Sequence, residues 1–125
     1  MSKKSVENYI PQVMQIVQNK FPDGIAPKEF NGYISSFGAS ISQSGLQATV
    51  ALFENKQADT AQERSCLTKI ILEVLKSKEE NLLQHILNYN GNQALLKMNI
   101  IDIAIALKLS LRTFKLEKGL EDVRC

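Results

Sequence analysis

The feature that most constrains this chain is a helical spacing of apolar residues that recurs along most of its length. The spacing is clearest in one stretch where five apolar residues fall at i, i+3, i+4, i+7 and i+8: Leu67, Ile70, Ile71, Val74 and Leu75. Such a spacing places all of these side chains on one face of an α-helix. No segment alternates with a period of two for long enough to indicate a strand. The sequence therefore predicts an all-α fold without a sheet.

Apolar periodicity and turn residues together predict five to six helices in one compact bundle. With 125 residues, 44% of them hydrophobic, the chain is long enough for one domain and too short for two. We therefore expect residues 1–125 to form a single helical domain. The expected helices cover residues 6–17, 27–41, 46–53, 67–75 and 82–87, and a last helix begins near 92 or 99 and ends at 118.

Proline and glycine mark the points at which these helices begin, bend or end. Pro11 lies either in the first turn of the first helix or at a kink within it. Pro27 suits the first turn of the second helix. Gly45 either ends that helix or acts as a hinge into the next one, and Gly119 is the expected stop of the last helix.

The last helix carries apolar residues on two sides of its helical wheel. A surface helix needs only one such side. Either this helix is central and packs against partners on both sides, or its second stripe is a docking surface for another protein. The first stripe consists of Ile100, Ile103, Leu107, Leu111 and Phe114, and the second of Met98, Ile101, Ile105, Leu109 and Leu116.

A basic row lies between the two stripes and consists of Lys108, Arg112 and Lys115. The side opposite this row is small or polar, with Ala106, Ser110, Thr113 and Glu117. Three cations in a row form either a solvated face or a track that binds phosphates. The net charge of the chain is only +2, so any electrostatic argument depends on where the charges lie.

The sequence lacks the residue patterns of the common catalytic and metal sites. His85 is the only histidine and has no partner at metal-ligand spacing. Cys66 and Cys125 lie far apart, so they do not suggest a metal site, and Cys66 is expected to pack in the core. Phosphate-binding glycine motifs are missing. We therefore expect a protein that is not an enzyme and that uses no metal or cofactor.

The N-terminal residues lack the apolar run of a signal peptide. The longest mostly apolar stretch, residues 98–111, is shorter than the roughly 20 residues that span a bilayer. It also contains Asp102 and Lys108. A cytoplasmic location without membrane contact is therefore expected.

One stretch, residues 33–56, resembles the small helical subunit of the Cmr-type (type III-B) CRISPR RNA-silencing effector complex. In that family an aromatic-led helix ends in a polar residue and Gly-Leu, and a small-residue helix follows that ends in an aromatic residue with a lysine shortly after. The matching residues are Tyr33, Ile41, Ser44, Gly45, Leu46, Ala51, Leu52, Phe53 and Lys56. The basic, apolar and aromatic mix of the family's last helix is similar to Leu107, Lys108, Leu111, Arg112 and Phe114. This chain departs from the family in having no tryptophan there.

The resemblance implies an architectural role in antiviral defence. Members are non-catalytic subunits that stack on copies of themselves and on other subunits along the duplex of guide RNA and target RNA. Under this hypothesis the basic row binds the RNA backbone, joined by Lys56, and the second stripe from Met98 to Leu109 contacts a neighbouring subunit. If the row proves to be only solvated, the RNA track is to be sought among four other lysines: Lys20, Lys28, Lys69 and Lys76.

Two other classes of function compete with this hypothesis. A helical DNA-binding regulator requires a recognition helix that exposes Arg, Asn or Gln to base edges. The expected fifth helix is polar, with Asn81, Gln84, His85 and Asn88, but carries almost no positive charge. A generic protein adaptor would bind no nucleic acid. A salt-sensitive gel shift on RNA, compared with duplex DNA, separates the three classes.

Overall fold

The computed structural model describes residues 3–55 and 61–117. In these residues the chain forms six helices and two short strands, which confirms the predicted helical bundle. The helices are α1 (Lys3–Lys20), α2 (Glu29–Ser44), α3 (Leu46–Phe53), α4 (Ala61–Val74), α5 (Leu82–Asn88) and α6 (Gln93–Leu111). The strands are β1 (Ile25–Pro27) and β2 (Lys115–Glu117).

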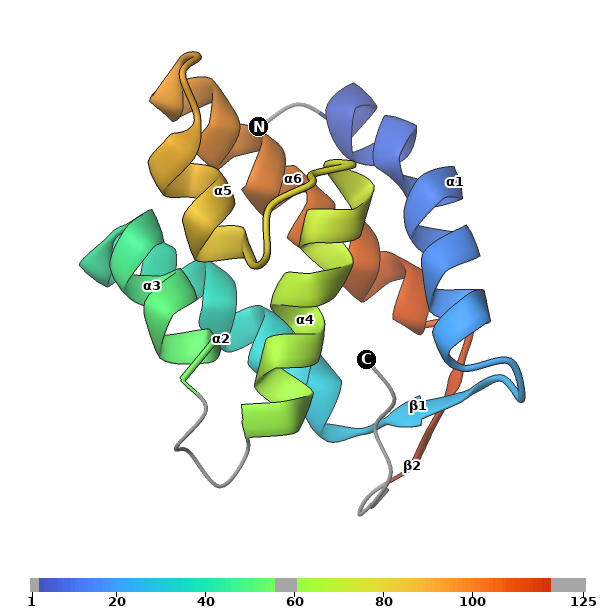
Figure 1. The fold of residues 1–125 in the computed structure, drawn as a ribbon. Coiled ribbons are helices and arrows are strands. Elements are labelled where there is room, and N and C mark those ends of the chain that lie inside the picture. The colour runs from blue at the N-terminus through green and yellow to red at the C-terminus, as the bar shows by residue number, and fades with distance from the viewer. Residues whose placement is uncertain (1–2, 56–60, 118–125) are drawn as a thin grey trace.

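Helix α6 lies in the middle of the bundle (Figure 1). It packs most extensively against α1 and also contacts α2 and α4. The short helices α3 and α5 contact each other and α4 at one end of the molecule. This arrangement places α6 between several partner helices.

Two sides of α6 are buried. The first apolar stripe is in the core, since Ile100, Ile103 and Leu107 are fully buried. The part of the small side that lies on α6, Ala106 and Ser110, is buried as well, and Asp102 is buried one turn before Ala106. Small side chains at this spacing let a second helix approach closely, and α1 is the helix that packs there, with Tyr9 beside Asp102. The two buried sides of α6 are therefore the first stripe and the small side.

The prediction that the fold has no sheet was wrong in detail. Strands β1 and β2 pair in parallel, with Ile25 opposite Lys115 and Pro27 opposite Glu117. The Lys115 backbone N–H also donates to the Gly24 carbonyl, with 2.9 Å between nitrogen and oxygen. Each strand has only three residues, which is too short for a period-two pattern to be visible in sequence.

The expected end of α6 was also wrong, because the helix ends at Leu111 and not near residue 118. After Leu111 the chain makes hydrogen bonds of the 3₁₀ type, between residues three positions apart. The Thr113 N–H donates to the Ser110 carbonyl, and the Phe114 N–H donates to the Leu111 carbonyl. The chain then pairs as β2 with β1. Gly119, the expected stop, lies outside the described residues.

The other boundary residues behave in part as predicted. Gly45 both ends α2 and begins α3, with a φ of 92° that favours glycine. Pro11 lies inside α1, whereas Pro27 lies in β1 just before α2 and not in its first turn. Asn92 begins α6 by accepting a hydrogen bond at its side-chain oxygen from the Leu95 N–H, at 3.1 Å.

Candidate functional site

An apolar groove of about 200 Å³ runs between α2 and α6. Ile34, Phe37 and Ile41 of α2 form one wall, and Ile101 and Ile105 of α6 form the other. The α2 side chains are anchored in the core, where the Phe37 ring packs edge-to-face on Phe53 at 5.2 Å between ring centres. The groove is therefore an apolar surface formed by α2 and α6, and two residues of the second stripe, Ile101 and Ile105, lie in one of its walls.

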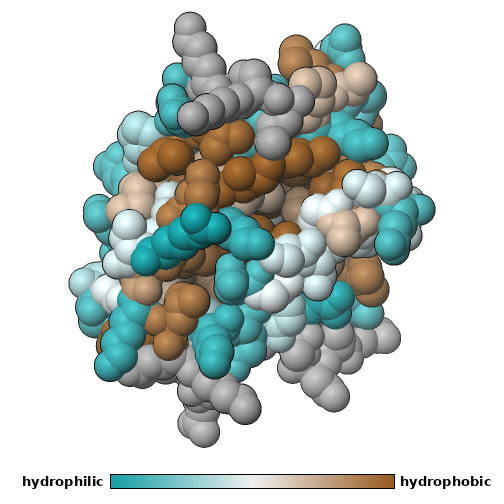
Figure 2. Space-filling view, turned by 180° about the vertical axis from the view of Figure 1, so that it is seen from behind, coloured by the Kyte–Doolittle hydropathy of each residue, from teal (hydrophilic) through white to brown (hydrophobic). Residues whose placement is uncertain are grey.

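The second stripe of α6 is the side of this helix that remains open to solvent. Met98 is 45% exposed, and Ile101, Ile105 and Leu109 are half-buried at the edge of the core. Figure 2 shows the molecule from behind α4, and apolar side chains gather in a band on this face. The second stripe is therefore only partly covered by the rest of the chain, and the docking of another protein on it stays a prediction.

Lys108 lies at the rim of the groove and is tied to α2. Its Nζ donates a hydrogen bond to the Ser35 hydroxyl at 2.7 Å, across 73 positions of sequence. An ammonium group has three N–H donors, so this contact leaves donors for a further acceptor. The contact fixes the lysine beside the apolar groove instead of leaving it extended in solvent.

The structure does not place the basic row on one helix. Arg112 caps the C-terminus of α6 and is exposed, one turn beyond Lys108. Lys115 is exposed as well but belongs to strand β2. The expectation that all three cations lie on the last helix was therefore wrong, because α6 ends at Leu111. Lys56, the fourth expected cation, lies outside the described residues.

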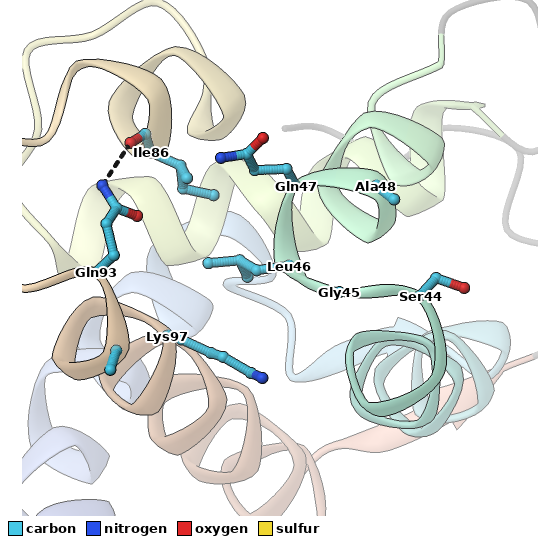
Figure 3. Close-up of a pocket in the computed structure, with 9 residues that line it drawn as sticks. Ser44, Gly45, Leu46, Gln47, Ala48, Ile86, Gln93 and Lys97 are labelled. Carbon is cyan, nitrogen blue, oxygen red and sulfur yellow. Dashed lines mark hydrogen bonds between the residues drawn. The ribbon is translucent and has the colours of Figure 1, made fainter.

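A second, larger hollow of about 560 Å³ lies at the Gly-Leu junction between α2 and α3 (Figure 3). Leu46 points into it from the start of α3, and Lys97 extends along it from α6. The Gln93 amide nitrogen closes one side by donating to the Ile86 carbonyl at 3.2 Å. The segment that carries the family resemblance therefore forms one wall of a surface hollow.

Sequence reasoning missed three exposed leucines. Leu87 of α5 is 54% exposed, and Leu52 and Leu95 are similarly exposed. Leu95 precedes Met98 by three residues, so it extends the open face of α6 by nearly one turn. The predicted stripe began at Met98 and left this leucine out, although its spacing was a usable signal.

Some of the remaining candidate residues are held in contacts within the bundle, and others are exposed. The His85 Nδ1 lies 2.8 Å from the Ser77 hydroxyl, and Cys66 is fully buried, as expected. Lys20, one of the alternative cations, forms an ion pair with Glu73 at 3.1 Å. Lys28, Lys69 and Lys76 are exposed.

Neither a membrane span nor a metal cluster is found in the described part of the chain. In residues 3–55 and 61–117, no helix combines the length and the apolar character that crossing a bilayer requires. The same residues contain no group of three or more His, Cys, Asp or Glu side chains placed to hold a metal ion.

Comparison with known proteins decides the family. The model of a family described as CRISPR-associated protein (Cas_Cmr5) matches residues 2–106, which include the apolar walls of the groove, the Gly-Leu junction and α6 as far as Ala106. The chain belongs to this family. Cas_Cmr5 proteins are a CRISPR-associated Cmr subunit family, so the chain is a subunit that works with other CRISPR effector subunits. Searches of curated proteins and of solved structures returned no significant match.

Proposed function

We propose that this Cas_Cmr5 chain is a non-catalytic small subunit of a type III-B CRISPR effector complex. It stacks with copies of itself and with other subunits along the duplex of guide RNA and target RNA, and it contacts the backbone of that duplex. The observation that carries the proposal is the open α2–α6 groove, with a cation fixed at its rim, in a chain of this family.

The groove supports docking because one of its walls is anchored in the core and the other is partly accessible to solvent. Phe37 and Ile41 are buried in the core and cannot turn away from the groove, whereas Ile101 and Ile105 are only half-buried and present part of their surface to solvent. Removing apolar surface from water is worth roughly 25 cal/mol per Å². An apolar side chain of a neighbouring subunit that enters the groove gains this energy without a rearrangement of α2 or α6.

The cations support a backbone contact and not a base-reading contact. Lys108 and Arg112 are four residues apart at the end of α6, and Arg112 presents a planar fork of donors that suits phosphate. A-form duplexes are read mainly by shape and backbone. In a guide-programmed complex, base pairing reads the sequence, so cations that bind phosphate are sufficient for the protein.

A non-catalytic role agrees with how the polar residues are used. The His85–Ser77 pair is joined through Nδ1, and the Ser77 oxygen also accepts the Glu79 backbone N–H at 3.0 Å. Both groups therefore serve the turn that precedes α5. We propose that target cleavage and nucleotide synthesis belong to other subunits.

The two competing classes find less support. Helix α5 has only seven residues and no lysine or arginine, so it makes a poor recognition helix for DNA. A generic adaptor accounts for the groove but gives no role to the cations beside it. Family membership favours the effector subunit over both alternatives.

The docking part of the proposal is tested with Ile105→Glu in the reconstituted complex. The variant should remain helical by circular dichroism and fail to assemble, because a carboxylate enters the groove. Leu52→Glu is the matched control, since Leu52 is an exposed leucine of α3 outside the groove. Normal assembly of Ile105→Glu contradicts docking at this groove. An unfolded Ile105→Glu monomer shows that the stripe is core and that docking occurs elsewhere.

A further inference from the structure

A third hollow, of about 450 Å³, lies between the end of α1 and the segment that follows α6. Met14 and Gln18 of α1, Phe21 after it, and Thr113 and Phe114 after α6 are among the residues that line it. None of these residues lines the α2–α6 groove. The lining residues Thr113 and Phe114 directly follow Arg112 in the chain, the exposed cation at the C-terminus of α6.

Contacts with the core and with neighbouring backbone hold the walls of this hollow in place. Phe21 is almost fully buried and packs edge-to-face on Phe30, with 6.0 Å between ring centres. The Thr113 hydroxyl donates to the Ser110 carbonyl at 2.8 Å. The pairing of β1 with β2 fixes the chain immediately after Phe114, whose ring is half-buried. The hollow is thus preformed and does not depend on the binding of a ligand.

The lining of the hollow combines apolar and aromatic side chains with the polar side chains of Gln18 and Thr113, and a cation, Arg112, precedes it in the chain. Gln18 is exposed and offers an amide, and Arg112 lies two residues before Phe114. No acidic residue lines the hollow in the described part of the chain. The nearby Asp23 carboxylate accepts the Ile25 backbone N–H at 3.3 Å. A flat aromatic group that carries a negative charge fits this combination better than a purely apolar ligand does.

We propose that this hollow receives the base of an unpaired RNA nucleotide, stacked against Phe114, while Arg112 binds the phosphate of the same nucleotide. The inference rests on the proposed RNA contact and deepens it, because it adds a site for a base to a site for the backbone. Stacking on an aromatic ring tolerates any base, since every base has a π-face. Such a site therefore orders an unpaired nucleotide without reading its sequence.

The test is a nuclear magnetic resonance titration of the full chain at low salt, which measures weak affinities. Two probes of equal length are compared: an oligouridylate and an abasic ribose-phosphate strand with the same charge. The chain should bind oligouridylate about tenfold more tightly, as is typical of base–aromatic stacking. The amide signals of Thr113 and Phe114 should shift only with the base-containing strand.

Variants separate the base site from the backbone site. Phe114→Leu should remove the difference between the two probes and leave the affinity for the abasic strand unchanged. Gln18→Glu, at an exposed position, should weaken oligouridylate binding even if Phe114→Leu does not fold. Arg112→Glu should weaken the binding of both probes. Equal affinity of the wild-type chain for both probes overturns the base site but leaves the backbone contact standing. Failure of both probes to bind overturns both.

Discussion

Asp102 provides the sharpest test of how α1 packs on α6. Its side chain is 2% exposed, and its Oδ1 has no hydrogen-bond partner among the described residues. Burial raises the pKa of Tyr9 above its ordinary value of 10.0, and the neighbouring Asp102 charge raises it further. A carboxylate is therefore held between two helices without full compensation.

Asp102→Asn keeps the shape of the side chain and removes its charge. A buried polar group without a partner costs about 1–3 kcal/mol, and a charged group costs more. The amide still needs partners of its own, so part of this cost remains. We expect the variant to raise the free energy of unfolding by about 1–2 kcal/mol. In a domain of this size that corresponds to roughly 4 °C in Tm per kcal/mol.

Urea denaturation of Asp102→Asn measures this change directly. The midpoint should rise while the m-value stays constant, because the surface exposed on unfolding does not change. Ser110→Ala is the matched control, since the Ser110 hydroxyl oxygen is also buried without a partner among the described residues but carries no charge. Its effect should be smaller. A fall in the stability of Asp102→Asn by about 1 kcal/mol or more, the value of one hydrogen bond, would refute the reasoning.

Two further predictions concern polar contacts within the bundle. The Glu54 carboxylate accepts the backbone N–H groups of Leu82 and Leu83 at 3.0 and 3.1 Å, so Glu54→Ala should lower the free energy of unfolding by about 2 kcal/mol in urea, with Glu54→Gln losing less. The raised pKa of Tyr9 means that the folded chain keeps a proton that the unfolded chain releases. The contribution of Tyr9 to the free energy of unfolding is therefore complete below pH 10 and is lost as the pH rises through the raised pKa. When unfolding is measured at increasing pH above 10, the free energy of unfolding should fall less in Tyr9→Phe than in the wild type.

The core was predictable from sequence because helical periodicity reports directly on burial. Leu67, Ile70 and Ile71 form one stripe in the sequence and are fully buried in the structure. The sheet was not predictable, since β1 and β2 have three residues each and pair across about 90 positions of sequence. Only the side-by-side packing of α1 and α6 brings them together. The same pairing explains why α6 ends at Leu111 although the helical periodicity of the sequence continues past it.

The candidate site was predictable only in part. The helical wheel identified Ile101 and Ile105, which do face outward beside the core. It could not identify the opposite wall from Ile34 to Ile41, because periodicity within one helix does not show which other helix lies beside it. The contact between Lys108 and Ser35 was beyond the sequence for the same reason.

The most direct test of the central claim is target-RNA binding by the assembled complex that carries Arg112→Glu. The variant should assemble normally, because Arg112 is exposed and does not line the α2–α6 groove. It should weaken target binding about equally for unrelated guide sequences, since phosphate contacts carry no sequence information. The slope of log K against log salt should also become shallower, by roughly 0.7–0.9 for each phosphate that the variant no longer neutralises. Unchanged affinity and unchanged salt dependence at low salt would contradict the account.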